Sequence, residues 1–315
     1  MKLWWWNLVQ ALLLLLLAPL AVTLLKKFKA RLQNRRGPGL LQGYRDLLKL
    51  IDKQVVLAEH SSWLFRFAPY IIFASTVLAA AIIPVTLVSA PFSLTADVIA
   101  LVALLAVGRF FTALAGMDSG TAFGGMGASR EMTISALAEP AMLMSIFVLS
   151  MAAHSTNMTT MITMVMNSGL ELRPSLAFAL AAMLMVAVAE TGRIPVDNPD
   201  THLELTMIHE AMILEYTGRH LALIEWASQI KLLLFATLIT NLFFPWGMAT
   251  DVTVLAIGLA SLFWIAKLVL LLAALALLET WMAKMRIFRV PEYLGIAFLL
   301  AILGMLTHYI LEVSV

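Results

Sequence analysis

Acidic residues gather in one part of this chain, between residues 190 and 225. Seven of its nineteen acids lie there: Glu190, Asp197, Asp200, Glu204, Glu210, Glu215 and Glu225. Carboxylates crowded beside an apolar medium raise one another's pKa through repulsion and desolvation, so such a cluster can pass protons on near neutral pH. On a helix, Asp197, Asp200 and Glu204 would share one face, and Arg193 is predicted to pair with Glu190. The alternative interpretation is a solvated acidic loop.

A second group of ionisable residues lies inside long apolar stretches: Arg109, Glu139, Lys231, Lys267 and Glu279. A charge at the centre of a bilayer costs roughly 2.5–3.5 kcal/mol, so each needs a partner or a wet cavity. Lys231 and Glu279 are near the ends of their stretches and could extend to the interface. Glu139 and Lys267 predict a polar axis through the helix bundle, with Glu139 as a continuation of the proton path.

A basic segment precedes a short amphipathic pattern near the N-terminus. Arg35 and Arg36 lead into Gly37-Pro38-Gly39, which predicts a tight turn. Residues 41–52 then predict an amphipathic helix, with apolar side chains at helical spacing. The segment is either an interfacial helix behind a positively charged loop or a docking surface for a cytoplasmic partner. The docking candidates here are Arg35, Arg36, Gly37, Pro38, Tyr44, Arg45 and Asp46.

The elements that must position these residues are membrane helices. The chain is 62% hydrophobic and 13% charged, against about 25% charged in soluble domains, and its mean hydropathy is +0.93. A span needs about 20 apolar residues. Such stretches lie near 4–25, 68–90, 96–117, 130–153, 174–192, 229–246, 253–279 and 292–312. The sequence therefore predicts an all-α, polytopic bundle of about eight helices in one domain over 1–315, and a first helix that is retained.

Basic residues set the expected orientation, because they accumulate in cytoplasmic loops. They are dense after the first predicted helix, at 26–66, and recur after the fifth and the seventh. Two long cytoplasmic loops are therefore expected, at about 26–67 and 191–228. Both termini are expected outside a bacterial or archaeal cytoplasmic (inner) membrane.

The chain contains no cysteine, which excludes a disulfide framework and a Cys-ligated iron–sulfur cluster within it. It also shows no haem, flavin or nucleotide fingerprint, so no cofactor, and no catalysis by the chain alone, is expected. The glycine-rich stretch Gly120–Gly127 is more typical of a flexible loop or a close helix contact than of a phosphate site. The expected surroundings are the lipid bilayer and partner proteins, with no nucleic acid.

Two motifs resemble one family. Residues 31–50, RLQNRRGPGLLQGYRDLLKL, resemble the first cytoplasmic loop of NADH dehydrogenase subunit 1, a membrane subunit of complex I. Residues 190–216, ETGRIPVDNPDTHLELTMIHEAMILEY, resemble that family's second long loop. The matching positions are Glu190, Thr191, Arg193, Pro195, Asp197, Glu204, Glu215 and Tyr216.

The second motif departs from the respiratory pattern in length and in composition. It is about three residues longer, and Asn198, Pro199 and His202 replace the usual residues, so one family acid is missing at His202. These features, and the stretch GRFFTALAGMDSGTAFGGMGASRE at 108–131, are similar to the homologous subunit of group 4 membrane-bound [NiFe] hydrogenases. That branch includes the formate hydrogenlyase and hydrogenase-4 types.

The resemblance implies a membrane anchor that holds a peripheral arm. The implied partners are a [NiFe] hydrogenase large subunit, an iron–sulfur small subunit and antiporter-like membrane subunits; the [NiFe] centre and iron–sulfur clusters would belong to these partners. The acids of the second loop, with Glu139 and Lys267, would link redox events to ion movement. Arg35, Arg36, Arg130 and Arg193 would hold the junction.

Three other interpretations stay open at this point. The chain could form the quinone chamber of a respiratory complex I, or it could be a stand-alone ion transporter. Paired broken helices and internal symmetry, which many transporters carry, are not visible in the sequence. The third alternative is an anchor that takes no part in ion movement.

Overall fold

The computed structural model describes residues 4–57, 61–88, 97–168, 173–198 and 207–312. Its regular elements are helices, and seven of them are long and apolar enough to cross a membrane. These are α1 (Trp4–Leu32), α3 (Trp63–Ile82), α4 (Val98–Asp118), α5 (Ala122–Ala153), α9 (Gly218–Phe243), α10 (Val254–Trp281) and α11 (Val290–Thr307). A shorter apolar helix, α7 (Pro174–Glu190), occupies the fifth predicted span. The predicted all-α bundle is confirmed.

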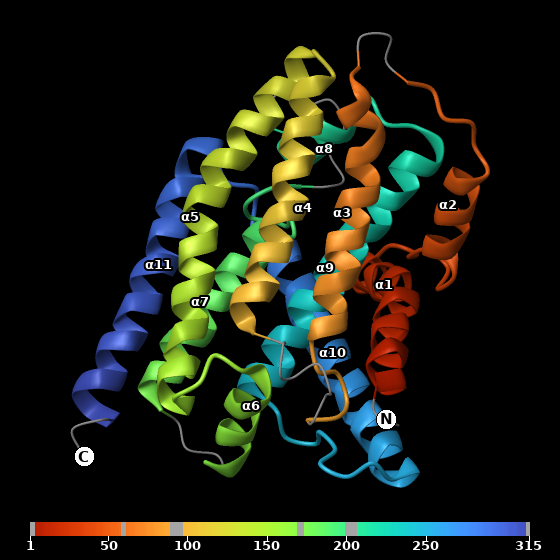
Figure 1. Cartoon of the computed structure of the whole chain (residues 1–315). Coiled ribbons are helices and arrows are strands. Elements are labelled where there is room, and N and C mark those ends of the chain that lie inside the picture. Colours follow the sequence, from red (N-terminus) through yellow and green to blue (C-terminus); the bar gives the residue numbers. More distant parts are fainter. Residues whose placement is uncertain (1–3, 58–60, 89–96, 169–172, 199–206, 313–315) are drawn as a thin grey trace.

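The bundle has two ends with different decoration (Figure 1). The short helices α2 (Gln42–Ile51) and α8 (His209–Ile213) lie at one end, and α6 (Met158–Asn167) lies at the other. Helix α11 packs on α5 and α7, α3 packs on α4 and α9, and α1 packs on α9 and α10. The described chain begins and ends at the α6 end of the bundle.

Polar side chains begin several of the helices. Ser62, Asp97, Thr121 and Thr253 each accept a hydrogen bond from a backbone N–H two or three residues into α3, α4, α5 and α10. Such caps satisfy donors that lack an intrahelical partner. At the other end of α5, His154 adopts a left-handed conformation that stops the helix.

A proline inside α1 creates a link to α9. Pro19 has no N–H, so the carbonyl of Leu15 loses its helical partner. The indole N–H of Trp226 in α9 donates to that carbonyl at 3.1 Å. In lipid, a neighbouring helix must satisfy such a freed group, so this hydrogen bond fixes α9 against α1.

The two long connections differ in detail from the predicted loops. Helix α1 continues to Leu32, and α9 begins at Gly218, so the second connection is shorter than predicted and Glu225 lies in a membrane helix. The predicted amphipathic helix at 41–52 is confirmed as α2. Asp197 lies in an irregular stretch, so the prediction that it shares a helical face with two later acids is wrong.

Helix α2 packs against the bundle through a close backbone approach. A side chain at Gly43 would meet the backbone oxygen of Pro19 at 2.8 Å, so only glycine fits there. The phenol of Tyr44 donates to the carbonyl of Leu16, one turn before that proline. Leu47 is buried, whereas Leu48 is 61% exposed. Helix α2 therefore has an anchored face and an open apolar face.

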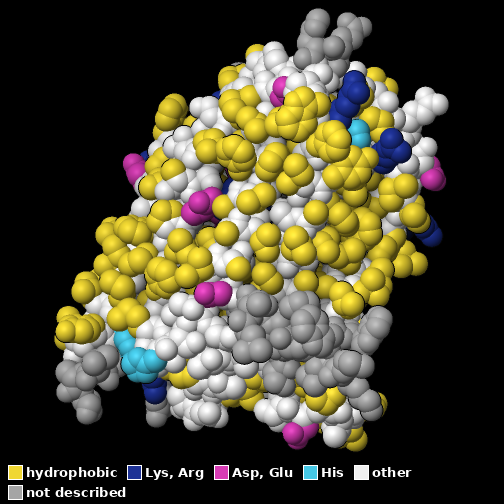
Figure 2. Space-filling view, viewed as in Figure 1, with side chains coloured by type: hydrophobic (Ala, Val, Ile, Leu, Met, Phe, Trp, Pro, Cys, Tyr) yellow, Lys and Arg dark blue, Asp and Glu magenta, His cyan; other side chains and the backbone are white. Residues whose placement is uncertain are grey.

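Hydrophobic side chains form a broad band around the middle of the molecule (Figure 2). Lys and Arg gather toward the end that carries α2 in this view. A wide apolar surface of this kind suits a bilayer, because lipid tails cover it without loss of solvation.

Candidate functional site

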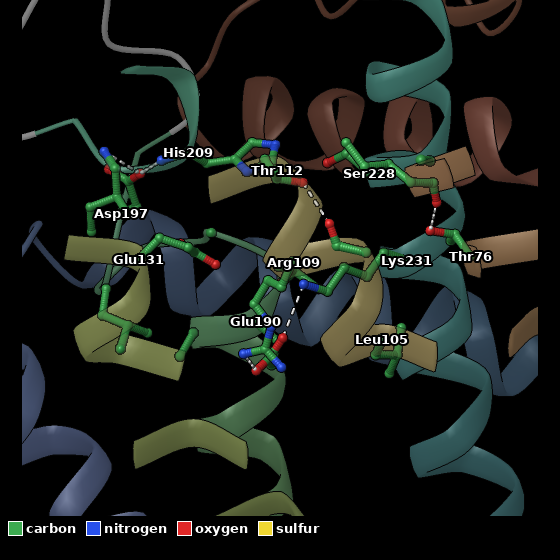
Figure 3. Close-up of a pocket in the computed structure, with 18 of the residues that line it drawn as sticks. Thr76, Leu105, Arg109, Thr112, Glu131, Glu190, Asp197, His209, Ser228 and Lys231 are labelled. Atoms are coloured by element: carbon green, nitrogen blue, oxygen red, sulfur yellow. Dashed lines mark hydrogen bonds and ion pairs between the residues drawn. The ribbon is translucent and has the colours of Figure 1, made fainter. Parts of the chain in front are cut away.

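A buried polar cavity lies below α8, where α4, α5, α7 and α9 meet. Its volume is about 60 Å³, enough for a few water molecules at about 15 Å³ of such volume each. Its wall carries a cation from α4, Arg109, a cation from α9, Lys231, and carboxylates from α5 and α7. Figure 3 shows the labelled side chains converging on this space.

Three ion pairs run through the wall of the cavity. Arg109 pairs with Glu190, whose side chain is fully buried. The second guanidinium nitrogen of Arg109 lies 3.1 Å from Glu139 Oε1, and Lys231 Nζ lies 3.0 Å from Glu190 Oε2. The hydroxyl of Ser135 also donates to Glu139 at 2.9 Å. The row Glu139–Arg109–Glu190–Lys231 therefore crosses four helices, which we call the charge row.

Glu131 faces the same cavity and is the functional candidate that sequence reasoning missed. It lies in the first part of α5, and its carboxyl group points toward the space that Lys231 also faces (Figure 3). No ion pair or hydrogen bond among the described residues includes it. Its spacing from Glu139, eight residues, places both acids on one helical face, and that spacing was the available signal.

The charge balance of the cavity leaves room for one proton. In the part of the chain that the structure describes, the charge row and Glu131 contribute three glutamates and two cations. Separated charges are expensive in a low-dielectric interior, so the cluster reaches neutrality when one glutamate is protonated. This arrangement can accept and release a proton without a net change in its ion pairs.

Asp197 organises the roof of the cavity. One carboxylate oxygen accepts from the backbone N–H groups of Ile208 and His209 at 3.2 and 3.3 Å, at the start of α8. The other lies 3.0 Å from Lys284 Nζ, in the connection between α10 and α11. The same connection donates a backbone hydrogen bond from Met285 to the carbonyl of Pro195 at 2.8 Å.

His209 borders the cavity from this roof. Burial lowers the pKa of His209 from its ordinary 6.5, and Lys231 acts in the same direction, against Glu210 and Asp197. The neutral imidazole can donate through one ring nitrogen and accept through the other. His209 can therefore relay a proton between the roof and the cavity.

Glycines bring α8 close to the turn between α4 and α5. A side chain at Gly127 would meet the carbonyl oxygen of Ile208 at 2.9 Å, and one at Gly116 would meet Met212 at 3.1 Å. Arg130 donates to the carbonyl of Met207 at 3.0 Å. Of the two predicted roles for the glycine-rich stretch, the close helix contact is confirmed.

Arg193 does not pair with Glu190, which corrects the expectation from their spacing. Its guanidinium lies 3.6 Å from Glu279, a buried residue of α10 that also binds Lys29 of α1 at 3.3 Å. Glu190 sits at the end of α7 and faces α4 and α9, whereas the chain turns away at Gly192. Neither Glu279 nor Lys231 extends to the interface, because each has a buried partner.

Lys267 does not continue the charge row, so the predicted axis from Glu139 to Lys267 is wrong. Its ammonium donates to the carbonyls of Phe244 and Trp246 at 2.9 and 3.2 Å, just beyond the last residue of α9. Glu139 instead pairs with Arg109. Lys267 faces a separate hollow on the outside of the bundle.

The remaining acids of the second connection lie nearer the surface or outside the described residues. Glu210 is half-buried in α8, and Glu215 is exposed after it. Asp200 and Glu204, with His202, lie outside the described residues. Tyr216 is buried, donates to the Phe65 carbonyl at 2.9 Å, and has its pKa raised by that burial.

Most of the docking candidates lie on one surface at the α2 end. Arg35, Arg36, Arg45 and Asp46 are exposed, and Gly37 and Pro38 are partly so. Gln42 binds Asp46 at 2.8 Å. Tyr44 faces α1, and burial raises its pKa. Arg193 and Arg130 are directed into the chain by the contacts described above.

The fold and the site define a class: polytopic helical membrane proteins with a buried carboxylate–cation row beneath a folded connecting segment. The chain belongs to the NADH dehydrogenase family, whose pattern matches residues 6–309.

Two relatives from Escherichia coli are similar over nearly their whole length. Formate hydrogenlyase subunit 4 is 36% identical over 93% of this chain and 95% of the relative. Hydrogenase-4 component C is 34% identical over 94% and 93%. A membrane subunit of the NADH-quinone oxidoreductase of Syntrophotalea carbinolica is 28% identical over 73% of each chain.

A solved structure shares the fold. A chain of the membrane-bound sulfane sulfur reductase, an archaeal respiratory membrane complex, superimposes with a TM-score of 0.79 over 95% of this chain and 98% of that one. Its sequence identity is 18%, so the likeness concerns the fold alone.

Proposed function

We propose that this chain is the membrane anchor and ion-coupling subunit of a multisubunit [NiFe] hydrogenase of the formate hydrogenlyase type. It would join a peripheral electron-transfer arm to antiporter-like membrane subunits. The observation that carries the proposal is the charge row with Glu131, which lies in the membrane helices directly below the roof formed by α8. The two Escherichia coli relatives supply the type of complex.

The redox centres are assigned to partner subunits. The chain has no cysteine, and its described residues contain no group of three His, Cys, Asp or Glu side chains arranged to hold a metal. The [NiFe] centre would lie in a hydrogenase large subunit, and iron–sulfur clusters in a small subunit. The chain itself would supply structure and proton-carrying groups.

The proposed ion path enters through the acidic second connection. Glu215, Glu210, Asp200 and Glu204 would collect protons near the peripheral arm, and Asp197 would hold the roof in place. His209 and Glu131 would then pass a proton to the charge row. Glu139, which is a third exposed at the far end of the row, would hand it toward the antiporter-like partners.

The proposed orientation follows from the basic surface. Lys and Arg residues concentrate at the end that carries α2, and basic loops are cytoplasmic as a rule. The peripheral arm would dock there, on Arg35, Arg36, Arg45 and Asp46, with the open apolar face of α2 beneath it. Both termini would then face the outside of the cytoplasmic membrane.

Co-purification tests the assembly. The tagged chain is extracted in mild detergent, its partners are identified by mass spectrometry, and nickel and iron are measured. Nickel together with a hydrogenase large subunit and iron–sulfur proteins is the expected result. A metal-free chain that purifies alone would contradict the proposal and favour a stand-alone transporter.

A quinone-reducing complex I is the second candidate, because relatives from NADH-quinone oxidoreductases match most of the chain. The same purification separates the two. Iron without nickel, together with NADH- or quinone-linked subunits, would assign the chain to that branch instead.

A further inference from the structure

Lys267 lies at the edge of the membrane region, away from the charge row. It is midway along α10, but its ammonium reaches the carbonyls of Phe244 and Trp246, which follow the last residue of α9. These residues begin the connection to α10. The ammonium therefore lies level with the end of a membrane span, where lipid headgroups are found.

The surface around Lys267 is hollow. A cavity of about 520 Å³ lies between the end of α9 and α10, lined by Phe244, Trp246, Phe263 and Leu270 among others. Phe263 is 53% exposed and Leu270 74%, so the hollow opens outward from the bundle. In a bilayer such a space is filled, because a void would lose the dispersion contacts of its lining.

A second cavity extends the hollow into a groove. It has a volume of about 260 Å³, lies between α7, α9, α10 and α11, and ends near Tyr293. Ile239 and Leu271 line both cavities. The combined groove is almost entirely aliphatic and aromatic, with a cation at one end. Its shape and chemistry match a molecule with an anionic head and a long apolar chain.

The ammonium lacks a counter-ion within the described residues. Its two hydrogen bonds go to backbone carbonyls, and no ion pair includes it. An ammonium has three donors, so one is left for a further acceptor. A cation beside lipid tails is costly without an opposite charge, and the phosphate of a lipid supplies one.

We propose that this groove binds an anionic phospholipid, with its phosphate on Lys267 and one acyl chain between α9 and α10. The inference is independent of the hydrogenase function. The competing occupant is a carboxylate from a neighbouring subunit, with that subunit's side chains in the groove.

Native mass spectrometry of the full-length chain tests the site. The chain is exchanged in mild detergent with phosphatidylglycerol or phosphatidylcholine, and the retained lipid is counted. The wild type should retain one phosphatidylglycerol in preference to phosphatidylcholine by about fivefold, the size of effect expected for one lysine near an anionic lipid. Lys267→Gln should abolish the preference and Lys267→Arg should keep it. Lys53→Gln, which removes an exposed lysine outside the groove, should change nothing.

A second variant keeps the test sharp if Lys267→Gln folds poorly. Leu271→Trp fills the groove but leaves the ammonium, and should reduce retention of the anionic lipid. Equal retention of the two lipids by the wild type would overturn the proposal. So would carbodiimide cross-linking of Lys267 to a partner's carboxylate in the intact complex.

Discussion

Arg109 of α4 and Glu190, the last residue of α7, form an ion pair in which the carboxylate side chain is fully buried. Lys231 of α9 approaches the other oxygen of the same carboxylate at 3.0 Å. One carboxylate thus holds two cations from two further helices. Three membrane helices are tied at a single point, directly below the roof of the cavity.

Removing that carboxylate should destabilise the bundle. Glu190→Gln leaves Lys231 without its ion-pair partner, and an uncompensated buried charge costs about 3–5 kcal/mol. Thermal unfolding in detergent should show a clear loss of stability. Glu190→Gln combined with Lys231→Met removes both charges and should recover part of the loss. If the double variant is as unstable as the sum of the single ones, the two residues are not coupled.

The link between α1 and α9 predicts a rescue. Trp226→Phe removes the donor to Leu15 and should cost about 1 kcal/mol, the scale of interhelical hydrogen bonds in membranes. In a Pro19→Ala background the residue at 19 regains its N–H and can bond to Leu15 itself. Trp226→Phe should then cost clearly less. An equal cost in both backgrounds would show that the indole acts only through packing.

Asp197 should control the order of α8. Asp197→Asn loses the ion pair with Lys284 and weakens the cap on Ile208 and His209, a change worth about 1 kcal/mol for a helix start. Hydrogen–deuterium exchange should rise across 207–213 in this variant and in Lys284→Gln. Lys53→Gln serves as the control, with exchange there expected to stay at the wild-type level.

His209 predicts a dependence of stability on pH. Burial lowers its pKa below the ordinary 6.5, so the folded state prefers the neutral ring. The stability that this provides is present above about pH 6.5 and is lost as pH falls toward the lower folded pKa. The wild type should therefore lose more thermal stability than His209→Gln between pH 7.5 and about pH 5.5. Parallel curves would show that His209 does not titrate differently on folding.

The sequence predicted the helices well because each span is a long apolar run. It also identified every member of the charge row as a candidate. It could not pair them: Glu190 and Arg193 are close in the chain, yet Arg193 turns toward α10 and Glu190 toward α4 and α9. Partners such as Lys284 for Asp197, far apart in the chain, depend on how the helices pack.

Glu131 was missed for a related reason. It sits at the polar start of α5, where an acid next to Arg130 is ordinary for a helix end in water. Only the fold places α8 over it and encloses it. The indole of Trp226 likewise reads as an interfacial aromatic until α1 presents a free carbonyl to it.

The central claim is that the charge row carries protons for a hydrogenase complex, and Glu139→Gln tests it most directly. Arg109 keeps Glu190 as a partner in this variant, so the fold should survive. The purified complex is placed in proteoliposomes, where hydrogen evolution from a reduced dye and ion movement are measured together, with pH-sensitive and sodium-sensitive probes. Asp251→Asn, an exposed acid in the connection before α10, is the matched control. We predict hydrogen evolution near the control level with ion movement lost; ion movement equal to the control would contradict the account.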